Sequence, residues 1–370
     1  MNVFLTFILY GFIILLFPYF VNLSLKQKRN TKTIALVLIS FLCALVATFR
    51  GNSGTDTSMY RTLYNFGEAS ITRWVSIEPG YMFLNNIFKG VGVSSNLFFG
   101  FLNLLTTFFV LLSIDREKNK VNVYVSSLIY FSTLYFQSFN IMRQALAVAI
   151  CLYAICLYLD NTKVASVTLI LIATLIHRSA IISLAIIVAK FMFEKRNSKL
   201  LIIISVAILM LLVLDRNLFG KIILTLTGSQ YYASYVLRNS GSRGSFLLYY
   251  VKLLPILLIS FLEIKNYKHS PNITVMFALM LFGYILSSLG VFTSTDINRL
   301  GMYFSTCDIL VMGYCANHNI SVGNLYIKKN LLIGVILIYF ILVFFIQTFI
   351  LGYYEIVPYH NMDIVYSPFV

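Results

Sequence analysis

Long apolar runs separated by short polar breaks fill the chain from one end to the other. Several of these runs reach about 20 residues, the length that an α-helix needs to cross the hydrocarbon core of a bilayer. The runs lack the alternation of apolar and polar residues, in segments of about 10, that is typical of a transmembrane β-barrel. The pattern therefore predicts an all-α, polytopic membrane bundle that forms a single domain over residues 1–370.

The breaks divide the chain into about twelve expected transmembrane helices. Segment 80–92 is amphipathic and too short to span a bilayer, so we expect an interfacial helix there. The expected spans are 3–21, 33–49, 95–114, 121–139, 141–159, 164–176, 179–193, 200–214, 246–263, 272–291, 300–316 and 331–349.

The composition agrees with a membrane protein. Only 11% of the residues are charged and 59% are hydrophobic, whereas soluble domains carry roughly 25% charged residues. The net charge of +15 does not indicate nucleic-acid binding, because the basic residues are scattered among loops. The five cysteines lie inside apolar runs, which favours buried side chains over disulfides or metal ligands. No basic stretch precedes run 3–21 and no small-residue cleavage site follows it, so we expect no cleavable signal.

The lysine-bearing loops set the expected orientation, because positively charged short loops stay on the cytoplasmic side. The densest cluster, KQKRNTK at 26–32, places the N-terminus outside. Alternation of the helices then puts segment 50–94, the long loop 215–245 and the C-terminal tail outside. The same alternation puts five further lysine-bearing breaks inside: DREKNK, DNTK, EKRNSK, EIKNYKH and IKKN.

Arginine and lysine divide unequally between the two expected sides. The cytoplasmic set holds 13 Lys and 3 Arg, and the outer set holds 9 Arg and 3 Lys. Orientation needs only positive charge, whereas the planar guanidinium group suits phosphate or carboxylate in a partly dry place. We therefore expect an anionic ligand outside. Four outer arginines lie at helix ends beside polar residues, where the alternative role is a membrane anchor: Arg50, Arg143, Arg178 and Arg299.

A histidine interrupts a stretch that is too short for two ordinary spans. Only 31 residues separate Lys163 from Lys195, and two full spans need about 40. A short hairpin over 164–193 would place His177 at its turn, on the floor of a cavity open to the outside. The alternative is one continuous tilted helix, which would invert every later loop. His177 is the histidine best placed to act as a base, and a structural, hydrogen-bonded histidine is the alternative.

Candidate carboxylates accompany these basic residues. The expected outer acids are Asp56, Glu78 and Asp296. Asp56 follows a Gly/Ser turn and precedes a helix-like run, so a helix N-cap is its alternative role. Asp308 lies inside an expected span, where it would bind across helices or tune an arginine. No Ser-His-Asp pattern, Gly-rich phosphate loop or His/Cys cluster is present, so we expect neither a metal nor a cofactor.

Five segments in chain order carry a family resemblance. They are FRGNSGTDTSMY, EPGYMFLN, NIMRQALAVAI, LIATLIHRSAII and NRLGMYF. Together they resemble the EpsG-like, Wzy-type polysaccharide polymerases of bacterial envelopes, and the likeness covers most of the chain. These polymerases are integral-membrane glycosyltransferases related to the O-antigen ligases. The resemblance thus implies a GT-C-like membrane fold in the bacterial inner membrane, with its active site facing the periplasm.

The resemblance also implies a reaction and its partners. A growing glycan would move from undecaprenyl diphosphate onto a hydroxyl of the next lipid-linked repeat unit, without a metal or nucleotide sugar. A chain-length regulator and a flippase are candidate protein partners, besides the lipid bilayer. The sugars and their linkage do not carry over, because the family is divergent, so O-antigen, capsule and exopolysaccharide stay open.

Each candidate residue then receives an expected role. His177 would take the proton from the acceptor hydroxyl, and inversion at the anomeric carbon would follow in a single displacement. Arg143, Arg178 and Arg299 would hold the diphosphate leaving group with help from Arg50. Asp56 and Glu78 would orient His177, an arginine or a sugar hydroxyl. Including these two, the remaining expected substrate-binding residues are Asp56, Glu78, Gln144, Tyr60, Arg238, Arg243, Tyr231 and Tyr232.

Four other functions stay open. A flippase for the same lipid-linked units would show two matching halves with broken helices, and the chain has no convincing second copy of segment 164–193. An envelope acyltransferase would also use one intramembrane histidine. An O-antigen-ligase-type transferase would differ from a polymerase only in its acceptor. A non-catalytic scaffold would leave the outer arginines unexplained.

Overall fold

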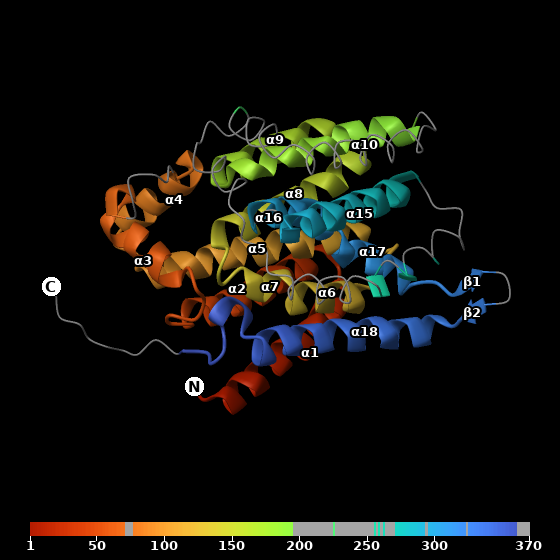
Figure 1. The fold of residues 1–370 in the computed structure, drawn as a ribbon, viewed down its shortest axis with the longest axis horizontal. Helices are drawn as coiled ribbons and strands as arrows, with labels where there is room; N and C mark the ends of the chain where they lie inside the picture. Colours follow the sequence, from red (N-terminus) through yellow and green to blue (C-terminus); the bar gives the residue numbers. More distant parts are fainter. Residues whose placement is uncertain are drawn as a thin grey trace.

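The computed structural model describes residues 1–70, 77–194, 271–292, 295–322 and 325–360, with six isolated positions between 225 and 262. Most of these residues lie in helices that run along the long axis of the molecule (Figure 1). Two expected helices, 200–214 and 246–263, and the expected loop 215–245 lie outside the described residues.

Five helices are long and apolar enough to cross a membrane within the described part of the chain. The central one is α8, because 94% of its apolar window is buried inside the molecule, against 28–39% for the three helices nearest the chain ends. The low burial of those three helices leaves large apolar side chains facing outward, as expected of helices in contact with lipid. The five are α1 (Val3–Ser24), α2 (Arg29–Thr48), α5 (Ser95–Glu117), α8 (Met142–Leu159) and the stretch Lys329–Ile350, which contains α18 (Lys329–Phe345).

The chain reverses direction at His177, between two short helices. α9 (Lys163–Ile176) ends at His177, whose backbone is extended with φ −151° and ψ 112°. A 3-10 helix, η2 (Arg178–Leu184), follows and leads into α10 (Ala185–Glu194). Lys190 of α10 donates a hydrogen bond to Asn161 Oδ1 at 2.7 Å, so α10 returns to the level at which α9 begins.

Two expected spans are interrupted, which corrects the prediction of one continuous helix in each. Segment 121–139 divides at Thr133, whose φ of −123° and ψ of −94° are not helical, into α6 (Val123–Ser132) and α7 (Leu134–Gln137). Segment 300–316 divides into α16 (Thr295–Ser305) and α17 (Asp308–Cys315). In both breaks a threonine hydroxyl bonds the carbonyl four residues earlier, a contact that bends helices. The number of twelve spans stays a prediction.

A small strand pair accompanies the helices, and the fold remains predominantly α-helical, as expected. β1 (Ile320–Val322) and β2 (Leu325–Ile327) form an antiparallel hairpin just before α18. The hairpin lies at one end of the bundle (Figure 1). It connects α17 to α18, and Ile320 at its start is buried in the apolar core.

The helix α15 (Pro271–Phe292) packs closely against α16 because glycines lie at the contact. A Cβ atom on Gly301 would lie 2.1 Å from Ser287 Oγ and 2.4 Å from the Gly283 carbonyl oxygen. Small residues at such a crossing let two helix backbones approach within a membrane. Ser287 also donates to the Asn298 carbonyl at 3.1 Å. This contact fixes the position of the first turns of α16.

Lysine-bearing segments meet at one end of the bundle, which we call the lysine end. Lys32 at the start of α2 lies 2.6 Å from Asp115 at the end of α5. Arg116 lies 2.7 Å from Asp160, just after α8. Asn317 Nδ2 bonds the Lys120 carbonyl at 3.3 Å. The loops at 26–32, 115–122, 160–163 and 316–319 therefore share one end.

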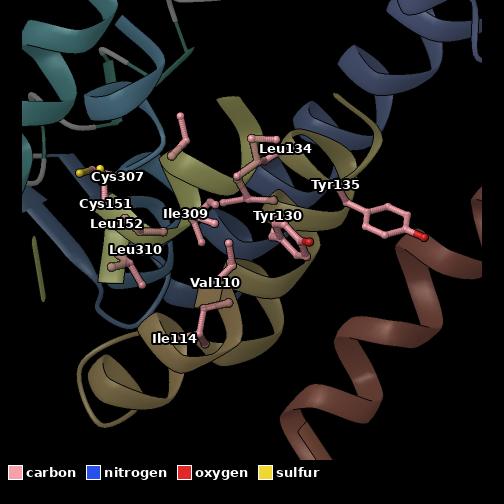
Figure 2. Packing of buried hydrophobic residues seen from close by; sticks show 14 of the residues in the cluster. Val110, Ile114, Tyr130, Leu134, Tyr135, Cys151, Leu152, Cys307, Ile309 and Leu310 are labelled. Atoms are coloured by element: carbon pink, nitrogen blue, oxygen red, sulfur yellow. The ribbon is translucent and has the colours of Figure 1, made fainter. Parts of the chain in front are cut away.

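The apolar core is built around α5, α6, α8 and α17. Figure 2 shows Val110, Tyr130, Leu152 and Leu310 packing together from these four helices. Tyr135 extends away from this cluster and donates its hydroxyl proton to the Cys43 carbonyl of α2 at 3.0 Å. The aromatic hydroxyl thus binds a neighbouring backbone inside an apolar region, as buried tyrosines usually do.

Candidate active site

The turn after α2 forms one wall of the opposite end of the bundle, which we call the arginine end. Gly54 has a φ of +108°, and a Cβ there would lie 3.0 Å from the Phe139 carbonyl oxygen, so the position suits glycine. Asn140 Oδ1 accepts hydrogen bonds from Thr55 Oγ1 at 2.5 Å and from the Asp56 backbone N at 2.8 Å. These contacts tie the turn to the start of α8.

The segment EPGY places a carboxylate deep inside this end. Glu78 precedes α4 (Pro79–Gly90), whose first residue is the proline favoured at that position. Gly80 lies against α9, because a Cβ there would be 2.8 Å from both the Cβ and the carbonyl oxygen of Leu175. α4 can therefore approach the last turn of α9. The approach brings Glu78 beside His177.

Glu78 joins three segments that are far apart in the chain. Its side chain is fully buried. Glu78 Oε1 lies 3.0 Å from His177 Nδ1 and 3.3 Å from the backbone N of Arg178. Glu78 Oε2 accepts a hydrogen bond from Arg143 Nη1. We call Glu78, Arg143 and His177 the buried triad.

The partners of Glu78 keep it ionised. Burial raises the pKa of Glu78, but the hydrogen bond and charge of His177 and the charge of Arg143 outweigh burial and lower the pKa to about 2. At neutral pH Glu78 is therefore a carboxylate, which only accepts hydrogen bonds. In neutral His177 the proton consequently lies on Nδ1, and Nε2 carries the lone pair.

The His177 side chain is 14% exposed. Among the described residues it makes no hydrogen bond through Nε2. A histidine whose Nδ1–H bonds a carboxylate and whose Nε2 is open has the arrangement of a general base, because the carboxylate sets the tautomer and stabilises the imidazolium. The geometry thus provides a base at the turn between α9 and η2.

Arg143 binds within the protein rather than projecting from it. Besides Glu78, it donates from Nε to the Tyr60 hydroxyl at 3.4 Å. Its guanidinium carbon lies 5.6 Å from the Tyr60 ring centre and 5.4 Å from that of Tyr81. The two rings favour the cation. Arg143 therefore balances the charge of Glu78, and Tyr60 lies behind it, only 4% exposed.

Two more accessible arginines lie beside the triad. Arg178 is half-buried and Arg299 is exposed. The Gln144 amide, next to Arg143, donates to the Arg299 carbonyl at 2.7 Å. Ser179 donates to the Tyr303 hydroxyl at 3.1 Å, so η2 and α16 also meet here. The two guanidinium groups border the same end of the bundle from different elements.

Arg50 lies away from the triad, in the core. It is only 2% exposed and bonds Met142 Sδ at 3.2 Å. Its guanidinium carbon lies 4.9 Å from the Phe139 ring centre and 5.7 Å from that of Phe99. The described structure thus packs Arg50 against Met142 and two aromatic rings.

The other expected site residues fall into two groups. Asp56 is half-buried, starts α3 (Thr57–Phe66) and makes no side-chain cap bond. Asp308 accepts a hydrogen bond from the Tyr284 hydroxyl at 2.6 Å inside the helical bundle. The expected residues Arg238, Arg243, Tyr231 and Tyr232 lie outside the described residues, as does the side chain of Asp296.

The sequence reasoning overlooked three residues that build the site: Gly80, Tyr81 and Asn140. All three lie in the segments EPGY and NIMRQ, but the sequence of these segments does not indicate which helix each residue contacts. Gly80 permits a contact, Tyr81 faces Arg143, and Asn140 holds the turn at 55–56. A glycine directly after Pro79 at a helix start was the available signal.

The fold and the site together define a class: a polytopic helical membrane protein with a buried Glu–His–Arg cluster and two more accessible arginines, Arg178 and Arg299, at one end. The family model of the EpsG family matches residues 32–361, and the chain belongs to this family. No curated protein and no solved structure matches the chain. The EpsG family comprises membrane proteins of polysaccharide biosynthesis, in general glycosyltransferase-like polymerases. The matched region contains Glu78, Arg143, His177, Arg178 and Arg299, and it does not include α1.

Proposed function

We propose that this chain elongates a glycan carried on undecaprenyl diphosphate, with the arginine end facing the outside of the bacterial inner membrane. The observation that carries the proposal is the bond from His177 Nδ1 to the buried Glu78 carboxylate. It leaves Nε2 as an acceptor at the accessible end of the bundle. Membership of the EpsG family supplies the class of substrate.

The proposed reaction is one displacement. His177 Nε2 takes the proton from the acceptor hydroxyl while the oxygen bonds the anomeric carbon of the donor glycan. The bond between that carbon and the diphosphate oxygen breaks, and its electron pair leaves with the diphosphate. Attack from the face opposite the leaving group inverts the anomeric centre. The imidazolium then returns its proton to water or to the released diphosphate.

The charges of the site suit the leaving group. Arg178 and Arg299 are the more accessible cations, and their planar forks bind phosphate oxygens in pairs. They stabilise the charge that develops on the diphosphate. Arg143 adds positive potential from behind while it holds Glu78. Gln144 positions Arg299 through its backbone carbonyl.

The orientation rests on the separation of the charges. The lysine end gathers the loops that the positive-inside tendency places in the cytoplasm. The two ends can be tested separately, because all five native cysteines are buried. An added Cys at exposed Asn52 should react with a membrane-impermeant thiol reagent from outside intact cells, and one at Lys26 should not. The reverse pattern would overturn the orientation.

The decisive test uses the purified full chain with synthetic undecaprenyl-diphosphate-linked repeat units in EDTA. We expect a ladder of products from the wild-type protein and none from His177→Ala. The matched control is His318→Ala at the lysine end, where His318 Nδ1 binds the carbonyl of Tyr314, and it should keep the ladder. A His177→Ala protein with normal polymer would overturn the proposed base. Transport of lipid-linked units without elongation would indicate a flippase, and transfer only to a different acceptor would indicate a ligase-type transferase.

A further inference from the structure

The segment after the last long helix folds back over the arginine end; we call residues 352–360 the C-terminal strap. The Glu355 carbonyl accepts from the Gly54 backbone N at 3.0 Å, and the Tyr354 carbonyl accepts from the Thr55 backbone N at 3.2 Å. Tyr10 of α1 donates its hydroxyl to the Ile356 carbonyl at 2.6 Å. The strap is therefore held on two sides.

Two neighbouring residues of the strap have an unfavourable backbone conformation. Tyr354 has a φ of 66° and Glu355 a φ of 51°. Side chains other than glycine rarely adopt this region, and each such residue costs about 1–2 kcal/mol. Backbone strain of this kind is often kept where a side chain must be held in one place for function.

The strap brings the Tyr354 side chain beside the proposed leaving-group site. Burial raises the pKa of the Tyr354 phenol to about 12, and the positive charge of Arg299 opposes this rise. The ring is half-buried. Within the described part of the chain, the hydroxyl of Tyr354 forms no hydrogen bond.

A series of hydrogen bonds connects Tyr354 to the segment that carries Arg143. Its backbone binds Thr55, whose side chain binds Asn140. Asn140 starts the segment that carries Arg143, and the next residue, Gln144, holds Arg299. Tyr354 thus borders the same polar end as the proposed base, although more than 170 residues separate it from His177 in the sequence.

We propose that Tyr354 is a sugar-binding residue that contacts the sugar attached directly to the diphosphate. This inference rests on the proposed function. Arg299 binds the diphosphate in that proposal, so the ring beside Arg299 faces the first sugar. A tyrosine offers an apolar face for the ring carbons of a sugar and a hydroxyl for its oxygens. The strained backbone holds that face in place.

The test measures binding of two lipids to the purified full chain. The first is the lipid-linked repeat unit extracted from producing cells whose polymerase carries His177→Ala, and the second is undecaprenyl diphosphate without sugar. For Tyr354→Ala we expect about tenfold weaker binding of the first lipid and unchanged binding of the second. Arg299→Ala should weaken both. Tyr353→Ala, in the exposed neighbour on the same strap, should weaken neither.

A glycine at the same position separates binding from folding. Tyr354→Gly relieves the backbone strain, so its thermal unfolding midpoint should not fall below that of Tyr354→Ala, while the sugar-dependent part of the affinity is still lost. Unchanged affinity of Tyr354→Gly or Tyr354→Ala for the lipid-linked unit would overturn the inference. Wild-type protein that binds neither lipid would instead overturn the proposed function.

Discussion

At the lysine end, Lys32 and Asp115 form a pair in which the side chains are 17% and 18% exposed, and Arg116 and Asp160 form one at 28% and 30%. At the arginine end, the Glu78 side chain is 0% exposed and binds both Arg143 and His177. Water screens the first kind of pair, and its contribution is small. The second kind has no water to replace a lost partner. The ion pairs of the lysine end therefore connect neighbouring loops in contact with water. Those of the arginine end hold an ionised carboxylate in a buried place.

The geometry around the pairs differs in the same way. Asp115 and Asp160 connect loops that are already close, since both follow long helices to the same end. Glu78, at the start of α4, instead binds Arg143 of α8 and His177 at the α9–η2 turn. A site assembled from separate elements keeps its geometry only while every element stays in place. Four variants or conditions test this contrast, from the largest expected effect to the smallest.

Glu78→Gln should have the largest effect. The amide cannot keep His177 in the required tautomer as a carboxylate does, and it leaves the Arg143 charge buried without its counter-ion. We expect at least a 100-fold loss of polymerisation rate and a loss of about 3–5 kcal/mol in the free energy of unfolding, measured by the ladder assay and by denaturant titration in detergent. Glu117→Gln is the matched control, because Glu117 is also a buried glutamate but pairs with the more exposed Lys120. Equal losses in both variants would remove the contrast between the ends.

Acid should destabilise the wild-type protein through the same residue. The pKa of Glu78 falls from its ordinary 4.5 to about 2 in the folded chain. Between these values the unfolded state binds more protons, so the stability that Glu78 contributes is present above pH 4.5 and is lost as the pH falls toward 2. The full loss is about 3 kcal/mol. Unfolding midpoints measured from pH 5 down to the lowest accessible pH (about 3) should fall less steeply in Glu78→Gln, and parallel curves would contradict the assignment.

Gly80→Ala tests whether the close approach of α4 to α9 maintains the site. The new methyl group would lie 2.8 Å from Leu175, so α4 must move outward and carry Glu78 away from His177. We expect about a tenfold to 100-fold loss of rate and a loss of about 1–3 kcal/mol in stability. Gly90→Ala is the matched control in the same helix, because nothing lies within 4 Å of a Cβ at that position. Full activity in Gly80→Ala would show that the contact is dispensable.

Asp160→Asn should have the smallest effect. It removes the partner of Arg116 at the lysine end, where both side chains are accessible. We expect a change of about 0.2–1 kcal/mol in the free energy of unfolding and an unchanged product ladder. A large loss of activity would show that the lysine end contributes to the reaction.

Several features could be predicted from the sequence because they depend on residues that are close in the chain. The apolar runs predict α1, α2, α5 and α8 within a few residues of their ends, since a membrane helix satisfies its own backbone groups. The spacing of Lys163 and Lys195 indicated a turn at His177. The excess of arginine on one side indicated the end at which the site lies.

Other features depend on packing, and the sequence alone did not reveal them. The roles of Glu78 were left open because its partners are 65 and 99 residues away, and no local pattern states which helices meet. In the sequence, Arg50 resembles the other outer arginines that lie at expected helix ends. In the structure, the rings of Phe99 and Phe139 lie against its guanidinium group. The breaks at Thr133 and at 306–307 interrupt apolar runs that hydropathy alone treats as continuous.

The sequence by itself thus determined the class of protein, the positions of most long helices and the histidine at the turn, because hydropathy, charge and segment length act locally. The tertiary structure decided which carboxylate binds that histidine, which arginine balances the charge of the carboxylate and which tyrosine the C-terminal strap carries beside them. The physical reason is that these contacts form between elements whose relative placement follows from close packing, as at Gly80 and Leu175, and not from any periodicity along the chain.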